Sequence, residues 1–225
     1  TFFTGSDFLV NKNAVGDIGA PVISRWANEW HGLEAVLNHF NVEFGLMVMF
    51  LAVCLGALYM INNIDDNGLR DNLRRNLMIC FGGFLLMLVL VLVQFITMEG
   101  FAVDADGVVV MEKGKYFHNL IQMPVVLIMF LLGAILLVAG VVMTLIRKEF
   151  NRGIWIAGPG TVLAVMAIFM IAGYNGTAYY PSTADIQCSL TLSNSCSSEF
   201  TLKTMALVSL IIPFVGAYIA YFWRQ

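Results

Sequence analysis

The chain has 225 residues, of which 59% are apolar and only 12% are charged, with a net charge of −3 and a mean hydropathy of +0.81. A soluble domain carries roughly 25% charged residues, so this chain has too few to cover a surface that faces water. The small net charge and the lack of a basic tract argue against a nucleic-acid partner, and the composition is that of an integral membrane protein.

Five apolar windows are long enough to cross the roughly 30 Å hydrocarbon layer as helices. Lipid offers no partner for a free backbone amide, and none of the windows alternates like a barrel strand, so each is predicted to be a helix. In chain order they cover residues 44–61, 77–98, 123–146, 154–172 and 204–223. The predicted fold is all-α: a polytopic bundle of about five transmembrane helices over 43–225, after a loop-rich segment with a short amphipathic stretch over 1–42.

Lysine and arginine predict the orientation, because short cytoplasmic loops carry an excess of both. They gather in the connections after the first and third windows and after the fifth window: Arg70, Arg74, Arg75, Arg147, Lys148, Arg152 and Arg224. We therefore place these connections and the C-terminus in the cytoplasm, and the segment 1–42 outside it.

The chain opens with Thr1 and lacks a charged stretch followed by an apolar core, so no signal peptide is predicted. A long loop-like segment precedes the first window. We interpret the chain as a fragment of a longer membrane protein.

Two of the four cysteines, Cys188 and Cys196, lie in the outer segment between the fourth and fifth windows. In an oxidising compartment we expect them to form a disulfide, the alternative being two free thiols. Cys54 and Cys80 belong to the spans and are interpreted as small packing residues.

Ionisable side chains are missing from the middle of every window; Glu43 precedes the first window and Glu99 follows the second. Proton relays and ion sites within a membrane usually depend on such groups. No catalytic residue is predicted, and a self-contained pump or ion-coupled transporter is disfavoured.

Candidate ligands for haem or a metal are also scarce. The three histidines, His31, His39 and His118, fall in outer segments, and the frequent methionines are typical filler of apolar spans. The spacing of His31 and His39, with Glu34 between them, fits no standard zinc pattern. Neither a metal site nor a cofactor ligand is predicted.

Gln94 and Thr97 are the most polar pair inside a window, three residues apart near its outer end. We interpret them as hydrogen-bonding a neighbouring helix, with a quinone carbonyl as the alternative. Small residues four apart predict close contacts between helices: Ala52 with Gly56, Gly160 with Ala164, and Gly216 with Ala220.

Motifs at four junctions carry a family resemblance. Residues 30–40, Trp-His-Gly-Leu-Glu-Ala-Val-Leu-Asn-His-Phe, precede the first window, and 98–101, Met-Glu-Gly-Phe, end the second. Residues 180–182, Tyr-Pro-Ser, follow the fourth window, and the serine-rich 197–205 leads into the fifth. In this order they resemble the C-terminal part of subunit II of the cytochrome bd ubiquinol oxidases, with His39 where that family commonly has proline.

The resemblance implies a nine-helix subunit of which this chain holds the last five helices, in the bacterial inner membrane. It implies a complex that oxidises quinol, reduces oxygen and generates proton-motive force. Haems b and d would belong to the partner, subunit I, and this chain would be a non-haem structural subunit packed against it. Lipid, quinone and small accessory subunits are the further implied partners, and a structural quinone or lipid the one implied ligand. The family's catalytic residues match no position of this chain.

Two functions from other classes stay open. Half of a secondary transporter or permease should show inverted repeats and broken helices, and the sequence shows no repeat. A membrane anchor or assembly protein would need a translation start of its own.

Overall fold

The computed structural model describes residues 2–11 and 24–224. Contacts between residues divide the chain into two units, Thr1–Thr191 and Leu192–Gln225. The first unit holds four long helices and a set of short elements, and the second holds the last apolar segment.

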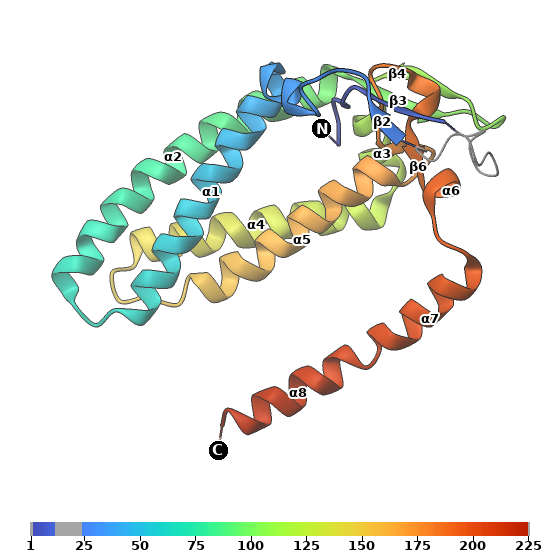
Figure 1. Cartoon of the computed structure of the whole chain (residues 1–225). Coiled ribbons are helices and arrows are strands. Elements are labelled where there is room, and N and C mark those ends of the chain that lie inside the picture. Colours follow the sequence, from blue (N-terminus) through green and yellow to red (C-terminus); the bar gives the residue numbers. More distant parts are fainter. Residues whose placement is uncertain (1, 12–23, 225) are drawn as a thin grey trace. The chain divides into compact units, whose positions relative to one another are not determined.

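The four long helices of the first unit form two antiparallel hairpins (Figure 1). One hairpin consists of α1 (His39–Asn63) and α2 (Asn67–Thr97), and the other of α4 (Pro124–Ile146) and α5 (Ile154–Gly173). Each is long and apolar enough to cross a membrane, as is the segment Glu199–Phe222 of the second unit. The all-α fold with five membrane-spanning segments, predicted from hydropathy, is confirmed.

Capping residues set where α1 and α2 begin. The Asn38 side chain accepts a hydrogen bond from the Phe40 N–H at 3.0 Å, and that of Asp66 accepts one from the Leu69 N–H at 2.7 Å. Both satisfy backbone donors that a helix start leaves unpaired. As a result α1 begins at His39 rather than 44, and α2 at Asn67 rather than 77. The windows marked the apolar cores of longer helices.

Glycines allow α4 and α5 to approach closely. A Cβ atom on Gly133 would lie 2.6 Å from the backbone nitrogen of Ala164 and 2.7 Å from the carbonyl oxygen of Gly160. The backbones therefore pack directly against each other, as small residues permit. The predicted contact at Gly160 and Ala164 is confirmed, whereas a Cβ on Gly56 would meet nothing within 4 Å.

The two short connections of the hairpins lie at the same end of the first unit (Figure 1). The Nη2 atom of Arg74 in α2 donates hydrogen bonds to the side-chain oxygen of Asn151, at 2.8 Å, and to the backbone oxygen of Lys148. Arg70 pairs with Asp65 at 3.0 Å. Arg74 thus links the two connections, whereas the Arg70 pair lies within the first of them.

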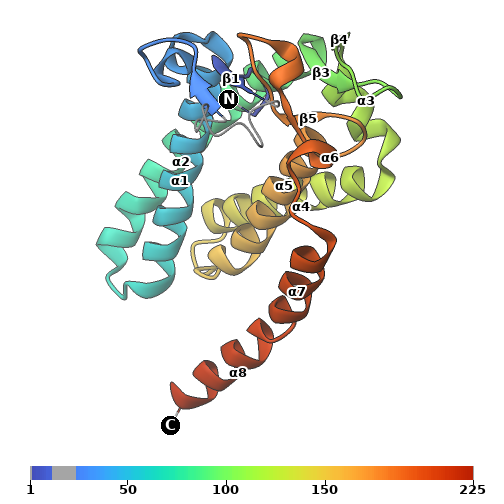
Figure 2. The same cartoon turned by 45° about the vertical axis from the view of Figure 1, so that its right-hand side comes forward.

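Short elements form a cap at the opposite end of the hairpins (Figure 2). They are β1 (Phe8–Val10), β2 (Ser24–Trp26), the 3-10 helix η1 (Leu33–Leu37), β3 (Glu99–Val103), β4 (Val109–Lys113), α3 (Lys115–Gln122), β5 (Ala178–Tyr180), η2 (Ile186–Cys188) and β6 (Leu190–Thr191). Their strands pair as three two-stranded antiparallel sheets, β1 with β2, β3 with β4, and β5 with β6.

Contacts between distant segments join the sheet of β3 and β4 to the segment that holds β5 and η2. Ala102 bridges to Thr177, and the Gln187 side chain bonds both the N–H and the carbonyl of Val109, at 3.1 and 2.8 Å. Hydropathy indicates only loops here, because strands this short carry no readable pattern. The cap is the part of the fold that hydropathy did not predict.

In the second unit the apolar segment is broken into α7 (Glu199–Ser209) and α8 (Ile212–Phe222), after the short α6 (Leu192–Ser195). Pro213 explains the break, since it lacks an N–H and its ring clashes with the carbonyl four residues earlier. At the break, the Ile211 N–H donates a hydrogen bond to the Val208 carbonyl, three residues earlier, at 3.0 Å. The single helix predicted over 204–223 is therefore two helical pieces.

Candidate functional site: an apolar cavity between two helix hairpins

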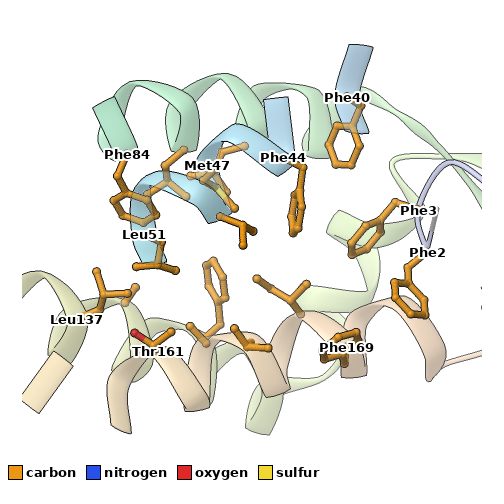
Figure 3. Close-up of a pocket in the computed structure, with 18 of the residues that line it drawn as sticks. Phe2, Phe3, Phe40, Phe44, Met47, Leu51, Phe84, Leu137, Thr161 and Phe169 are labelled. Atoms are coloured by element: carbon orange, nitrogen blue, oxygen red, sulfur yellow. The ribbon is translucent and has the colours of Figure 1, made fainter. Parts of the chain in front are cut away.

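An apolar cavity of about 470 Å³ lies between the two hairpins of the first unit. Figure 3 shows Met47, Leu51 and Phe84 on one side of it, facing Leu137 and Phe169 on the other. The side chains come from α1, α2, α4 and α5, and Phe2 and Phe3 of the N-terminal segment complete the wall. The volume lies within the range of small-molecule sites, roughly 300–1,000 Å³.

Asn41 and Thr161 are the polar side chains in the cavity wall, among the residues that the structure describes. The Thr161 hydroxyl donates to the Ala157 carbonyl of its own helix at 2.8 Å. Asn41 donates to the Ala35 carbonyl at 2.8 Å and accepts from the Thr4 hydroxyl at 2.9 Å. With these groups bonded to protein, the wall favours an apolar chain over a polar head group.

An aromatic cluster covers the cap end of the cavity. The ring of Phe3 is buried and meets those of Tyr116, Phe95 and Phe40 at centroid distances of 4.9, 5.4 and 6.1 Å, each close to edge-on. The Tyr116 hydroxyl donates to the Phe3 carbonyl at 3.1 Å, and burial raises the pKa of this phenol. The N-terminal segment is thereby fixed over the cavity, a role that its loop-like sequence does not reveal.

A buried amide connects α3 to the end of α5. Asn119 is fully buried and donates to the Ile171 carbonyl at 2.9 Å and to the Thr177 hydroxyl at 2.7 Å. Its own oxygen accepts from the Asn175 amide at 3.1 Å. These bonds satisfy polar groups that would otherwise be costly to bury, and they hold the cap on the second hairpin.

A carboxylate lies inside α1, close to the residues that line the cavity. Glu43 has a side chain only 11% exposed; its Oε1 lies 2.6 Å from Nε2 of His39, and its Oε2 accepts a hydrogen bond from the Gln94 amide of α2. The hydropathy window begins at 44 and so leaves Glu43 outside the span. The structure places Glu43 within helix α1, because the Asn38 cap starts the helix earlier than the window. The sequence does contain a signal for this pair: a helix-capping residue, Asn38, is followed by His39 and Glu43, which are four residues apart.

The two polar residues predicted inside the second span behave differently. Gln94 hydrogen-bonds α1 through Glu43, as the interpretation of a helix–helix contact expects. Thr97 is exposed and donates to the Val93 carbonyl of its own helix at 3.1 Å. Neither is among the residues that line the cavity, and contact of either with a quinone stays a prediction.

The cysteines predicted to form a disulfide lie in different units of the chain. Cys188 is buried in η2 and Cys196 is exposed, both as free thiols in this structure, and their pairing stays a prediction. Cys54 is buried in the helix core, and Cys80 is half-buried.

Residues 2–11 and 24–224 contain no group of three or more His, Cys, Asp or Glu side chains that could hold a metal ion. His118 pairs with Glu112 at 3.0 Å, and His31 contacts the Trp26 ring. That His31, His39 and Glu34 form no metal site stays a prediction. Among the described side chains in the cavity wall, only Met47 is of a type that ligates haem iron. The cavity therefore does not fit a haem held from two facing helices.

Five helical segments that are long and apolar enough to cross a membrane define the class: the chain is a polytopic α-helical integral membrane protein. Within that class it belongs to the cytochrome bd terminal oxidase subunit II family, whose profile matches residues 2–225. A comparison with curated proteins finds no match.

The family resemblance read from the four junctions is thereby confirmed. Family membership makes the chain a subunit of a bd-type quinol oxidase, a haem-containing respiratory complex. It also implies a partner oxidase subunit.

Proposed function

We propose that this chain is a non-haem structural subunit that packs against the haem-bearing subunit I of the oxidase in the bacterial inner membrane. Haems b and d belong to that partner, and this chain supplies no catalytic residue to the oxygen chemistry. The single observation that carries the proposal is the wall of the cavity, which offers one methionine and no histidine or cysteine among the described residues that line it. Family membership favours this function over half a transporter or an assembly protein.

An exposed apolar stripe supports contact with lipid or with the partner subunit. Val125, Ile128, Leu132 and Ile135 follow one another along one face of α4, and all four are exposed. Monomeric soluble proteins rarely expose contiguous apolar surface of this kind. In the proposal the segment 1–42 lies on the periplasmic side, and 43–225 is the membrane bundle that presents such faces to lipid and subunits.

The cavity gives the scaffold a second task in this proposal, which is to hold the isoprenoid tail of a quinone or the acyl chain of a lipid. Its polar side chains are bonded to protein, and its remaining wall is apolar. A long hydrocarbon chain would fill the space between the hairpins and stabilise their separation, since apolar surface is best buried against apolar surface.

One preparation tests both parts. The chain purified alone in mild detergent should show no haem absorbance, and organic extraction followed by mass spectrometry should release a quinone or a phospholipid that distinguishes the two sources. The variant Ala134→Phe fills the cavity and should lower the amount of bound ligand. Ile135→Phe, its neighbour on the exposed face of α4, is the matched control and should leave the amount unchanged. A stoichiometric haem spectrum contradicts the non-haem role, and equal ligand content in Ala134→Phe contradicts the cavity site.

A further inference from the structure

Glu43 differs from every other carboxylate in the described part of the chain because it is buried within a membrane-spanning helix. Ionisable groups in such helices are costly, and they commonly mark proton pathways. Both of its oxygens are engaged, Oε1 by His39 and Oε2 by Gln94. A purely structural link between α1 and α2 needs only the Gln94 contact, so the histidine calls for an explanation of its own.

His39 connects the buried carboxylate to water. Its side chain is 80% exposed, whereas that of Glu43 is 11% exposed, and the two are joined by a contact of 2.6 Å within one turn of α1. An imidazole is the side chain whose protonation changes most readily near neutral pH. The pair thus places a proton carrier at the surface and a proton acceptor behind it.

Few other charged groups face this pair. The helices α4 and α5, which contact α1, contain no charged residue, and α2 presents the neutral Gln94. The 3-10 helix η1, which also packs on α1, carries Glu34, whose Oε1 accepts the Asp7 N–H at 3.1 Å. Tyr116 of α3 belongs to the aromatic cluster that includes Phe40, and its hydroxyl is bonded to Phe3. His39 is therefore the one titratable partner that the structure gives Glu43 among the described residues.

We propose that His39 and Glu43 form a proton-exchange site that loads a buried carboxyl group from the aqueous phase at the cap end. Protonated His39 gives its Nε2 proton to Oε1 of Glu43; the N–H bond breaks, the O–H bond forms, and a neutral imidazole and a neutral carboxyl group remain. The imidazole then takes up a proton from water. This inference does not depend on the proposed scaffold function.

Infrared spectroscopy of the full chain in lipid tests the site. Acidification should produce C=O stretching bands of protonated carboxyl groups, and one component of these bands should be missing in Glu43→Gln, an isosteric change. After a jump in pH this component should appear at least about tenfold more slowly in His39→Gln, because a positioned acid–base group is lost. The matched control is His118→Gln, which removes another outer histidine paired with a glutamate, at 3.0 Å, and should leave the rate unchanged.

Two outcomes overturn the proposal: carboxyl bands that are the same in wild type and Glu43→Gln at every pH at which both chains stay folded, or an unaltered rate in His39→Gln. A measurement without any variant guards against failure of Glu43→Gln to fold. Dicyclohexylcarbodiimide reacts with protonated carboxyl groups in apolar surroundings, so it should modify Glu43 in the wild-type chain, as mapped by mass spectrometry. Lack of modification at Glu43 would count equally against the proposal.

Discussion

Tyr116 holds the N-terminal segment on the cap through a single hydroxyl group. Its ring is fully buried between those of Phe3 and Phe95, and its hydroxyl donates to the Phe3 carbonyl. Because this bond closes the cap end of the cavity, one buried polar contact links the start of the described chain to the candidate site.

The variant Tyr116→Phe should destabilise the chain by about 1–3 kcal/mol, since it leaves the Phe3 carbonyl buried without this donor. The loss should be measurable as a lower midpoint of thermal or denaturant unfolding in detergent. Tyr59→Phe is the matched control, because Tyr59 is exposed on α1. Equal stability of Tyr116→Phe and wild type would contradict the assigned role of the bond.

The same phenol predicts a dependence on pH. Burial raises the folded-state pKa of Tyr116 above the value of about 10 for an unfolded tyrosine. The associated stability is fully present below the unfolded value and is lost as the pH rises from there through the folded-state pKa. Unfolding midpoints of wild type should therefore fall more steeply above about pH 10 than those of Tyr116→Phe.

At the scale of elements, the contact between α4 and α5 depends on glycine. A Cβ atom at position 133 would lie 2.6 Å from the backbone nitrogen of Ala164 in α5. A backbone atom cannot move aside as the end of a flexible side chain can. This contact lies within the second hairpin, whereas the cavity lies between the two hairpins.

Gly133→Ala should lower stability by about 1–3 kcal/mol through overpacking, although alanine favours a helix more than glycine does. Gly56→Ala, where the new Cβ would meet nothing within 4 Å, should be neutral or slightly stabilising in the purified chain. Thermal unfolding of both variants in the same detergent makes the comparison. If Gly133→Ala were as stable as Gly56→Ala, the close approach of the two helices would be wrong.

At the scale of the whole molecule, charge and the number of spans predict the orientation. Five segments are long and apolar enough to cross a membrane, and an odd number of crossings predicts chain ends on opposite sides; the arginine-rich connections predict which side is the cytoplasm. This orientation, if correct, predicts that the cap with its strands β3 and β4 lies in the periplasm.

Reporter fusions test this orientation. Green fluorescent protein appended to residue 225 should fluoresce, since it folds in the cytoplasm, and alkaline phosphatase inserted at Gly107, between β3 and β4, should be active, since it folds in the periplasm. Exchanging the two reporters is the control and should silence both. Activity in the exchanged arrangement would reverse the topology.

Sequence alone determined the membrane-spanning helices. The hydrocarbon layer fixes the length of an apolar run and obliges it to bond its own backbone, so hydropathy is enough to find each span. The glycine contact at Gly160 and Ala164 was readable for a related reason, because small residues at helical spacing leave room for a second backbone. The helix break near Pro213 follows from the covalent structure of proline, so it too can be predicted from the sequence.

Only the tertiary structure decided the cap, the cavity and the surroundings of Glu43. The cap strands pair segments as distant as Ala102 and Thr177, and no local pattern encodes a partner so far along the chain. The cavity arises from the space left between two hairpins, and each of its residues looks like ordinary core in isolation. Glu43 is buried because α2 brings Gln94 against it. Burial of this kind depends on which helices meet, whereas a span depends on the residues within one helix.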